Sequence, residues 1–196
     1  RKAMLDACDK YGMLVMDELS DMWTKHKNPN DYALYFLEHV DAEVKSMVKK
    51  DYNHPSVVLY SAGNEIPDLG RPRGAQINRH ICNLFHEMDP YRFTTNAING
   101  MLAAGAKMGL IMKDVMAEME KMKAAQPEEK EEEGASALNS MMAFMVGDAA
   151  DAFACHPLMT ETIEEASQAM DITGINYLTG RHELEKELHP NKTVLG

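Results

Sequence analysis

Cysteine is scarce in this sequence. Its three cysteines, Cys8, Cys82 and Cys155, lie far apart in the chain. They form neither a C-x-x-C pair nor the dense, even-numbered set that marks a disulfide framework. A small disulfide-stapled scaffold is therefore excluded, and the three residues are expected to be buried or free thiols.

Long hydrophobic runs and excess positive charge are missing as well. No apolar run approaches the roughly 18 residues of a membrane-spanning helix, and short runs such as residues 13–16 and 57–60 suit buried strands instead. Lys and Arg number 20 against 31 Asp and Glu, which gives a net charge of −11. That charge would repel phosphate backbones and anionic lipid headgroups. Neither nucleic acid nor a membrane is expected as a partner.

Several catalytic and targeting motifs are also absent. No G-x-G-x-x-G or G-x-x-x-x-G-K-[ST] sequence is present, and neither Ser61 nor Ser140 sits in a G-x-S-x-G elbow. The opening residues, RKAMLDACDKYG, contain neither an initiator methionine nor a secretion-signal pattern. The chain is therefore expected to begin within a folded region, and a cytoplasmic location is the expectation.

The hydrophobic pattern that is present alternates between helical and strand periods. Helices are predicted over residues 1–11, 31–50, 77–88, 162–170 and 181–188, the fourth starting with a Thr162–Glu165 capping box. Strands are predicted over residues 13–16, 56–61, 93–97 and 172–177 and from Thr193 onward. This alternation indicates an α/β fold with a mainly parallel sheet, either doubly wound or a (β/α)₈ TIM barrel. The missing nucleotide-binding motifs favour the barrel.

A methionine-rich segment interrupts the alternation. Methionines recur with helical spacing between Met108 and Met122, and an acidic tract over residues 127–134 separates them from a second apolar stretch at 138–146. We interpret residues 101–146 as an inserted helical hairpin. Its methionine stripe is interpreted as ordinary core rather than as an adaptable binding surface, because methionine fills irregular gaps well.

Polar residues follow four of the predicted strands. They are Asp17-Glu18, Asn64-Glu65, Asn96 to Asn99, and Asn176-Tyr177. Reactive groups of a TIM barrel stand at the carboxyl ends of its strands. Asn64-Glu65 is the strongest candidate, because the pKa of a carboxyl group at the solvent-accessible end of a buried sheet can be shifted so that the group acts as a proton donor. The alternative is a loop-capping Asn beside a solvated Glu.

The residues around Glu65 carry a family resemblance. The segment DYNHPSVVLYSAGNE, residues 51–65, resembles the acid/base signature of the family 2 glycoside hydrolases, which include β-galactosidases, β-glucuronidases and β-mannosidases. Residues 5–23, 88–100 and 171–177 resemble flanking parts of the same barrel. Tyr52 and Tyr60 depart from the family pattern, which usually has Arg or Lys and Trp at these positions.

The resemblance implies a retaining glycosidase. Glu65 would be the general acid/base, Asn64 would bind the sugar 2-hydroxyl, and Tyr177 would contact the nucleophile. The nucleophilic Glu is expected about two residues beyond residue 196. Three further residues, Asp17, Glu18 and Asn99, are expected to contact substrate.

The residues after Asp17-Glu18 differ between branches of the family, and they bear on a magnesium site and on the role of Trp23. The magnesium-dependent branch of the family places a Glu and a His after the Asp-Glu pair, and residues 19–23 supply neither. No metal or other cofactor is therefore expected, although magnesium occurs in the family. Trp23 is expected either to border the sugar pocket or to pack in the core.

The chain as a whole is expected to be an incomplete TIM barrel. Residues 1–196 correspond to its third strand through the start of its seventh, with the methionine-rich insertion after the fifth, and this piece alone should be inactive. The most favoured activity is that of a β-galactosidase, in a protein that is expected to be a homo-oligomer binding carbohydrate. The alternatives are a β-glucuronidase, a β-mannosidase, or a catalytically silent carbohydrate-binding or scaffold piece.

Overall fold

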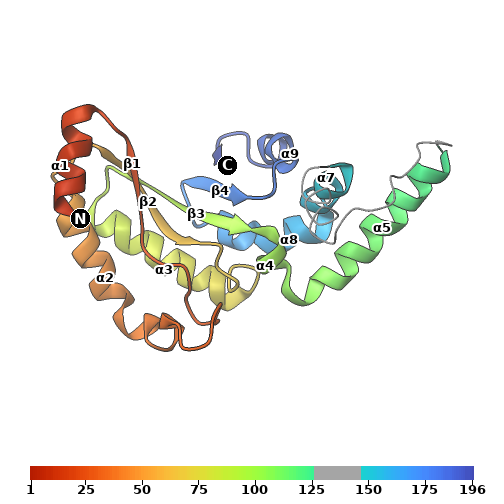
Figure 1. The fold of residues 1–196 in the computed structure, drawn as a ribbon, viewed down its shortest axis with the longest axis horizontal. Coiled ribbons are helices and arrows are strands. Elements are labelled where there is room, and N and C mark those ends of the chain that lie inside the picture. Colours follow the sequence, from red (N-terminus) through yellow and green to blue (C-terminus); the bar gives the residue numbers. More distant parts are fainter. Residues whose placement is uncertain (126–146) are drawn as a thin grey trace, which may run out of the picture.

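The protein is built on one sheet of five parallel strands. The computed structural model describes residues 1–125 and 147–196. The strands follow one another across the sheet in chain order, β1 to β5, and every neighbouring pair is parallel (Figure 1). Their bounds are β1 Val15–Glu18, β2 Val57–Asn64, β3 Phe93–Asn99, β4 Ile172–Asn176 and β5 Thr193–Leu195. Sequential parallel strands joined by helices are the pattern of a (β/α)₈ barrel, so the predicted incomplete barrel is confirmed.

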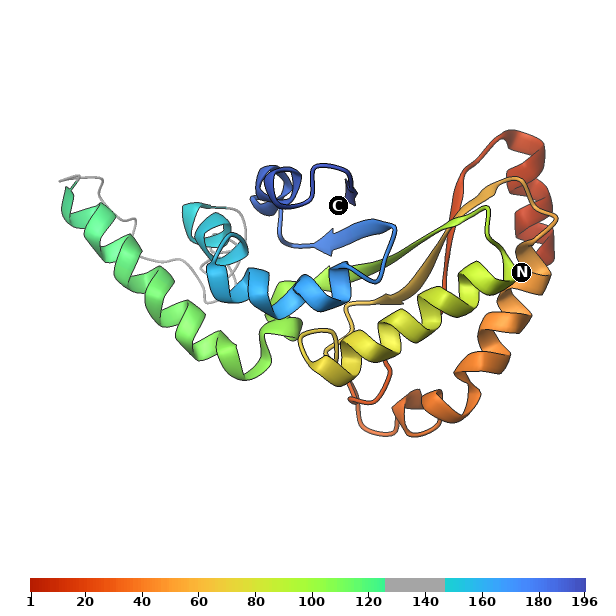
Figure 2. The ribbon, with the colours of Figure 1, turned by 180° about the vertical axis from the view of Figure 1, so that it is seen from behind.

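Helices connect the strands. Their bounds are α1 Lys2–Tyr11, α2 Phe36–Asp51, α3 Pro72–Met88, α4 Gly100–Ala104, α5 Met108–Ala125, α7 Asp148–Ala154, α8 Pro157–Ser167 and α9 Arg181–Leu188. Short 3₁₀ turns span Tyr32–Leu34 and Gly105–Lys107. Helices α2, α3 and α8 lie side by side along one face of the sheet (Figure 2). Within the described ranges, no helix is long and apolar enough to cross a membrane.

The core lies between this helix layer and the sheet. Tyr60 of β2 stacks on Phe85 of α3 with ring centroids 4.7 Å apart, and both side chains are fully buried. An aromatic pair of this kind contributes about 0.5–1.5 kcal/mol beyond the apolar area that it buries. The stacking therefore fixes how α3 sits against the strand that ends at the candidate Glu65.

Local signals in the sequence set several element boundaries. Gly12 adopts φ 70°, a left-handed conformation that favours glycine, and ends α1 as predicted. Helix α3 begins with Pro72 in its first turn and ends before the Asp89-Pro90 pair. Pro at the first turn costs nothing because the N–H it lacks would have no helical partner.

Several predicted boundaries are wrong, since α2 begins at Phe36 and α3 at Pro72 rather than at residues 31 and 77. Two further cases have a clear local reason. The first strand begins at Val15, and Met13 and Leu14 are exposed ahead of it. The capping box at Thr162 does not form, because α8 begins five residues earlier at Pro157. There the Nδ1 atom of His156 accepts a hydrogen bond from the Leu158 N–H and caps the helix. The Thr162 hydroxyl instead donates to the Leu158 carbonyl inside the helix.

In the described part of the predicted insertion, residues 101–125, α4 and a 3₁₀ turn lead into the long helix α5. Ile111 and Val115 are buried on α5, which packs against α7. Met116 and Met122 are exposed on the same helix, so the methionine stripe is only partly core. The predicted acidic tract over residues 127–134 and the apolar stretch at 138–146 lie outside the described residues.

Candidate active site

The carboxyl ends of β2 and β4 meet through the side chain of Asn176. Its Nδ2 atom donates to Glu65 Oε1 at 3.1 Å and to Asn64 Oδ1 at 3.2 Å. Strand β3 separates β2 from β4, and in a flat sheet strands two places apart would lie about 10 Å apart. The side chains therefore meet on the concave side of a curved sheet, at the edge where a barrel holds its chemistry.

A cavity confirms that the concave side is hollow. Its volume is about 260 Å³, and all five strands contribute to its lining: Met16, Ser61, Thr95, Ala97, Gly174, Ile175, Asn176 and Leu195, with Gly196. A larger, more open cleft of about 510 Å³ adjoins the end of β4 and is lined by Tyr177 and His182, among others. Both share Asn176, so it stands between the barrel interior and the open cleft.

Two of the predicted site residues have strained backbones. Glu65 adopts φ 55° and Tyr177 φ 59°, in the left-handed region that non-glycine residues rarely occupy. Each such residue costs on the order of 1–3 kcal/mol and persists where the surroundings hold it in place. Strain of this kind concentrates at functional sites. The two residues thus mark the ends of β2 and β4 as the candidate active site independently of any motif.

Asn64 is oriented by contacts on both sides of its amide. Its Nδ2 atom donates to Asp21 Oδ1 at 3.1 Å, and its Oδ1 atom accepts from Asn176. Its backbone N–H donates to the Ser20 carbonyl at 2.9 Å. The loop after β1 therefore fixes the residue that precedes Glu65.

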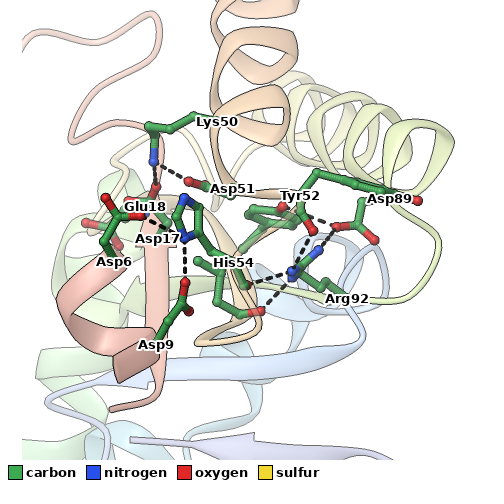
Figure 3. Close-up of polar contacts among 12 residues, drawn as sticks. Asp6, Asp9, Asp17, Glu18, Lys50, Asp51, Tyr52, His54, Asp89 and Arg92 are labelled. Atoms are coloured by element: carbon green, nitrogen blue, oxygen red, sulfur yellow. Dashed lines mark hydrogen bonds and ion pairs between the residues drawn. The ribbon is translucent and has the colours of Figure 1, made fainter. Parts of the chain in front are cut away.

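Asp17 and Glu18 point in different directions because successive side chains of a strand alternate between faces. Glu18 accepts a hydrogen bond from the Ser61 hydroxyl at 2.9 Å. Burial raises the pKa of the Glu18 carboxyl, and the negative charges of Asp21 and Asp17 add to the effect against the Ser61 hydrogen bond. Asp17 instead pairs with Lys50 of α2 at 2.5 Å (Figure 3). The expected pair is thus divided, and Asp17 lies away from Glu65.

Trp23 lies in the core, so the packing alternative is the correct one. Its side chain is 0% exposed, stacks on Phe36 with centroids 6.2 Å apart, and donates its Nε1–H to the Ala62 carbonyl at 3.3 Å. The loop after β1 folds back over the helix layer and buries the ring there. The expectation that Trp23 borders the sugar pocket is not met.

Asn99 and Tyr177 lie at the ends of β3 and β4. The Asn99 side chain accepts hydrogen bonds from Met101 N at 3.0 Å and Leu102 N at 3.3 Å, and so caps α4. An N-cap of this kind accounts for an Asn at this position without any substrate contact. Tyr177 is 56% exposed and lines the open cleft.

The structure adds residues to the site that had no assigned role. Asn176 was recognised as a strand-end residue, and the structure adds its contact with Glu65. Asp21 and Lys27 come from the loop after β1, and Lys27 Nζ donates to the Asn64 carbonyl at 2.8 Å. No sequence signal marks a loop residue whose partner lies 37 residues further on.

The loop after β1 does not fit the magnesium site of the family. The Ser20 hydroxyl donates to the Met22 carbonyl at 2.7 Å, and Asp21 accepts from Asn64. Residues 19–23 supply neither the Glu nor the His of that branch, and we derive no step through a metal.

The first half of the 51–65 signature acts at the opposite end of the sheet. His54 Nδ1 lies 2.6 Å from Asp9 Oδ2, a contact that ties the turn before β2 to α1 (Figure 3). Arg92 donates to the carbonyls of Tyr52 at 3.2 Å, His54 at 2.9 Å and Val57 at 2.6 Å. This end of the signature therefore anchors the turn that leads into β2, whereas Ser61, Asn64 and Glu65 of the same signature reach the candidate site.

A grouping of Asp6, Asp9 and His54 also lies at this end. Among the described residues it is the one set of three side chains spaced so that they could hold a metal ion. The hydrogen bond between His54 and Asp9, together with the Ser56 N–H that donates to Asp9 at 2.9 Å, already accounts for the cluster. Hydrogen bonds from Ser56 and His54 lower the pKa of Asp9 to about 2.

Comparison with known proteins places this arrangement in a family. Residues 1–141 match the family model described as Glycosyl hydrolases family 2, TIM barrel domain. A β-galactosidase, BoGH2A, from Bacteroides ovatus is 48% identical over 63 residues, which are 32% of this chain and 7% of that protein. A β-glucuronidase from Felis catus is 30% identical over 97 residues, which are 48% of this chain and 14% of that protein.

Solved structures agree with the sequence matches. The crystal structure of a glycosyl hydrolase family 2 member from Bacteroides cellulosilyticus superposes with a TM-score of 0.65 and 26% identity, and covers 98% of this chain and 17% of that one. The matches thus span a small part of the length of each relative. Because the family model covers well over half of the sequence, the chain belongs to glycosyl hydrolases family 2, and residues 1–141 form part of its TIM barrel domain.

Proposed function

We propose that the protein containing this chain hydrolyses β-glycosides with retention of configuration, with Glu65 as the general acid/base. The observation that carries the proposal is the Asn176 amide, which holds Glu65 Oε1 at 3.1 Å on the concave side of the sheet. Family membership and the strained backbone of Glu65 support the same role. A carboxyl group with fixed orientation at the barrel edge is what proton transfer to a bound glycoside requires.

The proposed reaction has two steps. In the first, Glu65 donates its proton to the leaving oxygen while a second carboxylate attacks the anomeric carbon and forms a glycosyl-enzyme intermediate. In the second, the Glu65 carboxylate takes a proton from water as that water attacks the same carbon and releases the sugar. This chemistry requires the two carboxyl groups to lie roughly 5–5.5 Å apart.

The second carboxylate is proposed to be a Glu that follows β5. Strand β5 pairs with β4 in parallel, so its carboxyl end points to the same edge as Asn176 and Tyr177. Tyr177 lines the cleft at this edge, and we assign it the role of partner to the nucleophile. Asn64 is assigned to the sugar 2-hydroxyl, with its amide already oriented by Asp21 and Asn176.

A β-galactoside is the substrate that we favour. The relative with 48% identity is a β-galactosidase, whereas the β-glucuronidase is 30% identical over its matched residues. The β-glucuronidase match, however, extends over 97 residues, so a β-glucuronide is the second candidate. A β-mannoside and a catalytically silent carbohydrate-binding role remain further alternatives.

A panel of nitrophenyl glycosides tests this proposal with the complete gene product. We expect turnover of the β-galactoside above the β-glucuronide and β-mannoside, and proton NMR should detect the β-anomer of the sugar as the first product. Release of the α-anomer would contradict the retaining mechanism. Binding of these sugars without turnover would favour the silent role.

Cellular location and assembly are separate proposals. A cytoplasmic location and a homo-oligomeric state stay predictions, and cell fractionation and light scattering of the complete protein test them.

A further inference from the structure

Lys27 holds one end of the peptide group that joins Asn64 to Glu65. Its Nζ atom donates to the Asn64 carbonyl oxygen at 2.8 Å. The other end of the same peptide group, the Glu65 N–H, donates to the Ala97 carbonyl of β3 at 2.8 Å. Both polar atoms of this peptide group are therefore held, from two different parts of the fold.

The orientation of this peptide group bears directly on the Glu65 side chain. The φ angle of Glu65 is the rotation about its N–Cα bond, which begins at this peptide plane. At φ 55° the backbone of Glu65 is in a strained conformation that would relax if the plane were released. Relaxation would change the direction of the Cα–Cβ bond and carry the carboxyl group away from Asn176. A hydrogen bond from a charged ammonium group is stronger than a neutral one and is well suited to prevent this.

The loop that carries Lys27 is itself braced on both sides of the lysine. Ahead of it, the N–H groups of Thr24 and Lys25 donate to Asp68 Oδ2 at 3.4 and 3.2 Å, and Asp68 is buried. At Lys27, the backbone N–H donates to Asp31 Oδ2 at 2.7 Å.

The Asp31 carboxylate accepts further backbone hydrogen bonds in addition to that of Lys27. Asn28 N also donates to its Oδ2 at 3.1 Å, and Ala33 N donates to its Oδ1 at 3.0 Å. These backbone hydrogen bonds, that of Asn28 above all, lower the pKa of Asp31 to about 2. The carboxylate is thus charged at neutral pH, and its hydrogen bond holds the backbone of Lys27 in place.

We propose that Lys27 is a positioning residue for Glu65, which it holds in its productive orientation through the backbone. The proposal rests on the acid/base role of Glu65. A lysine in the loop after β1 thus has a part in proton transfer. Lys27 acts through the backbone of Glu65 and not through its carboxyl group.

Leaving-group dependence in the complete protein tests the proposal. The variants are Lys27→Met, which removes the ammonium donor, and Lys27→Arg, which keeps a donor. The matched control is Lys25→Met, on the same loop, whose backbone bond to Asp68 is retained. Values of kcat/KM are measured on phenyl and 2,4-dinitrophenyl β-glycosides, because only the phenyl leaving group needs full protonation.

Lys27→Met should lower kcat/KM on the phenyl glycoside by about 10–100-fold, the scale of a misplaced reacting group, and much less on the dinitrophenyl glycoside. Lys27→Arg should recover most of the loss, and Lys25→Met should change neither rate. An equal loss on both substrates, or no loss at all, would overturn the positioning role. Circular dichroism checks folding, and if Lys27→Met is unfolded then Lys27→Gln, with a shorter donor, is judged by the same two rates.

Glu65→Gln measured alongside separates the two claims. If Glu65→Gln shows the leaving-group dependence and the Lys27 variants do not, only the role of Lys27 is lost. If Glu65→Gln itself lacks the dependence, the acid/base assignment fails and the role of Lys27 fails with it.

Discussion

The Asn176 amide bonds to Glu65 Oε1 at 3.1 Å although β3 lies between their two strands. This contact bridges the edge of the sheet across the end of β3, and it joins the ends of two strands that are each followed by a residue with a strained backbone. Asn176 also bonds Asn64 at 3.2 Å. One amide thus aligns both residues that we assign to the cleaved bond.

Asn176→Ala should therefore lower kcat far more than it weakens substrate binding. General acid–base catalysis contributes roughly 10²–10⁴-fold to the rate, and this contribution is the upper limit for the loss of kcat when the hydrogen bond that orients the acid is removed. Steady-state kinetics of the complete protein on the phenyl β-glycoside provides the measurement. Asn191→Ala, at an exposed position ahead of β5, is the control and should leave the rate unchanged. An unchanged kcat in Asn176→Ala would show that Glu65 needs no such support.

Trp23 offers a test that separates packing from sugar contact. Because the ring is fully buried against Phe36, Trp23→Ala should destabilise the domain by about 3–5 kcal/mol, the usual cost of truncating a buried aromatic ring. Trp23→Phe should cost less and should leave KM unchanged. Denaturant unfolding and steady-state kinetics of the two variants measure the two effects. A raised KM in Trp23→Phe at unchanged stability would restore the sugar-contact alternative.

Asp51 should make the stability of the protein depend on pH. Burial raises the pKa of its carboxyl to about 6, with the nearby Asp17 adding to the effect and Lys50 opposing it. The folded state therefore holds this proton more tightly than the unfolded state, whose Asp has a pKa near 3.8. Stability from this group is fully present below the unfolded pKa and is lost as the pH rises through about 6.

The Asp51→Asn variant should not lose stability as the pH rises through about 6, because its amide does not ionise. The thermal midpoint of the variant should lie above that of the wild type at pH 8, and the difference should shrink toward pH 4. Glu187→Gln, at an exposed position on α9, is the control and should follow the wild type at both pH values. A variant less stable than the wild type at pH 8 would mean that the Lys50 ion pair outweighs the burial of the charge.

His189 should give a pH dependence of its own, through the contact between α8 and α9. Burial opposes the charged imidazole, but hydrogen bonds to Glu164 at 3.0 Å and to Glu185 at 2.9 Å outweigh it and raise the His189 pKa. The cations Arg181 and Lys192 interact with the same carboxylates. With a raised folded pKa, the stabilisation is fully present below 6.5 and is lost as the pH rises through the higher folded value.

His189→Gln should abolish this part of the pH dependence. Thermal midpoints of the wild type and the variant should differ most at pH 6 and converge above the folded pKa. His80→Gln is the control, because that His pairs with Asp41 at 2.7 Å on the exposed surface. A constant difference across the range would rule out titration of His189 as the cause.

The sequence predicts the α/β architecture well because local signals place its main elements. Gly12 ends α1, Pro90 follows the end of α3, and apolar runs fall on β2 and β4. Two of the boundaries that were wrong are those where two signals compete. Met13 and Leu14 continue an apolar run without entering the sheet, and His156-Pro157 starts α8 ahead of the apparent capping box at Thr162.

The candidate site is predictable only in part. Position at a strand end identifies Asn64, Glu65 and Tyr177, since that property follows from the local hydrophobic pattern. The contact of Asn176 across β3 depends on the curvature of the whole sheet, which periodicity does not encode. Lys27 depends on a loop conformation fixed by distant carboxylates, and sequence spacing cannot reveal it.

The acid/base role of Glu65 is tested most directly by the Glu65→Gln variant of the complete protein. Its kcat/KM is measured on the phenyl and 2,4-dinitrophenyl β-glycosides, with the exposed Glu183→Gln variant as control. We expect a loss of about 10²–10⁴-fold on the phenyl glycoside, which needs the proton, and a far smaller loss on the dinitrophenyl glycoside. Equal losses on the two substrates would contradict the assignment of Glu65 as the general acid/base.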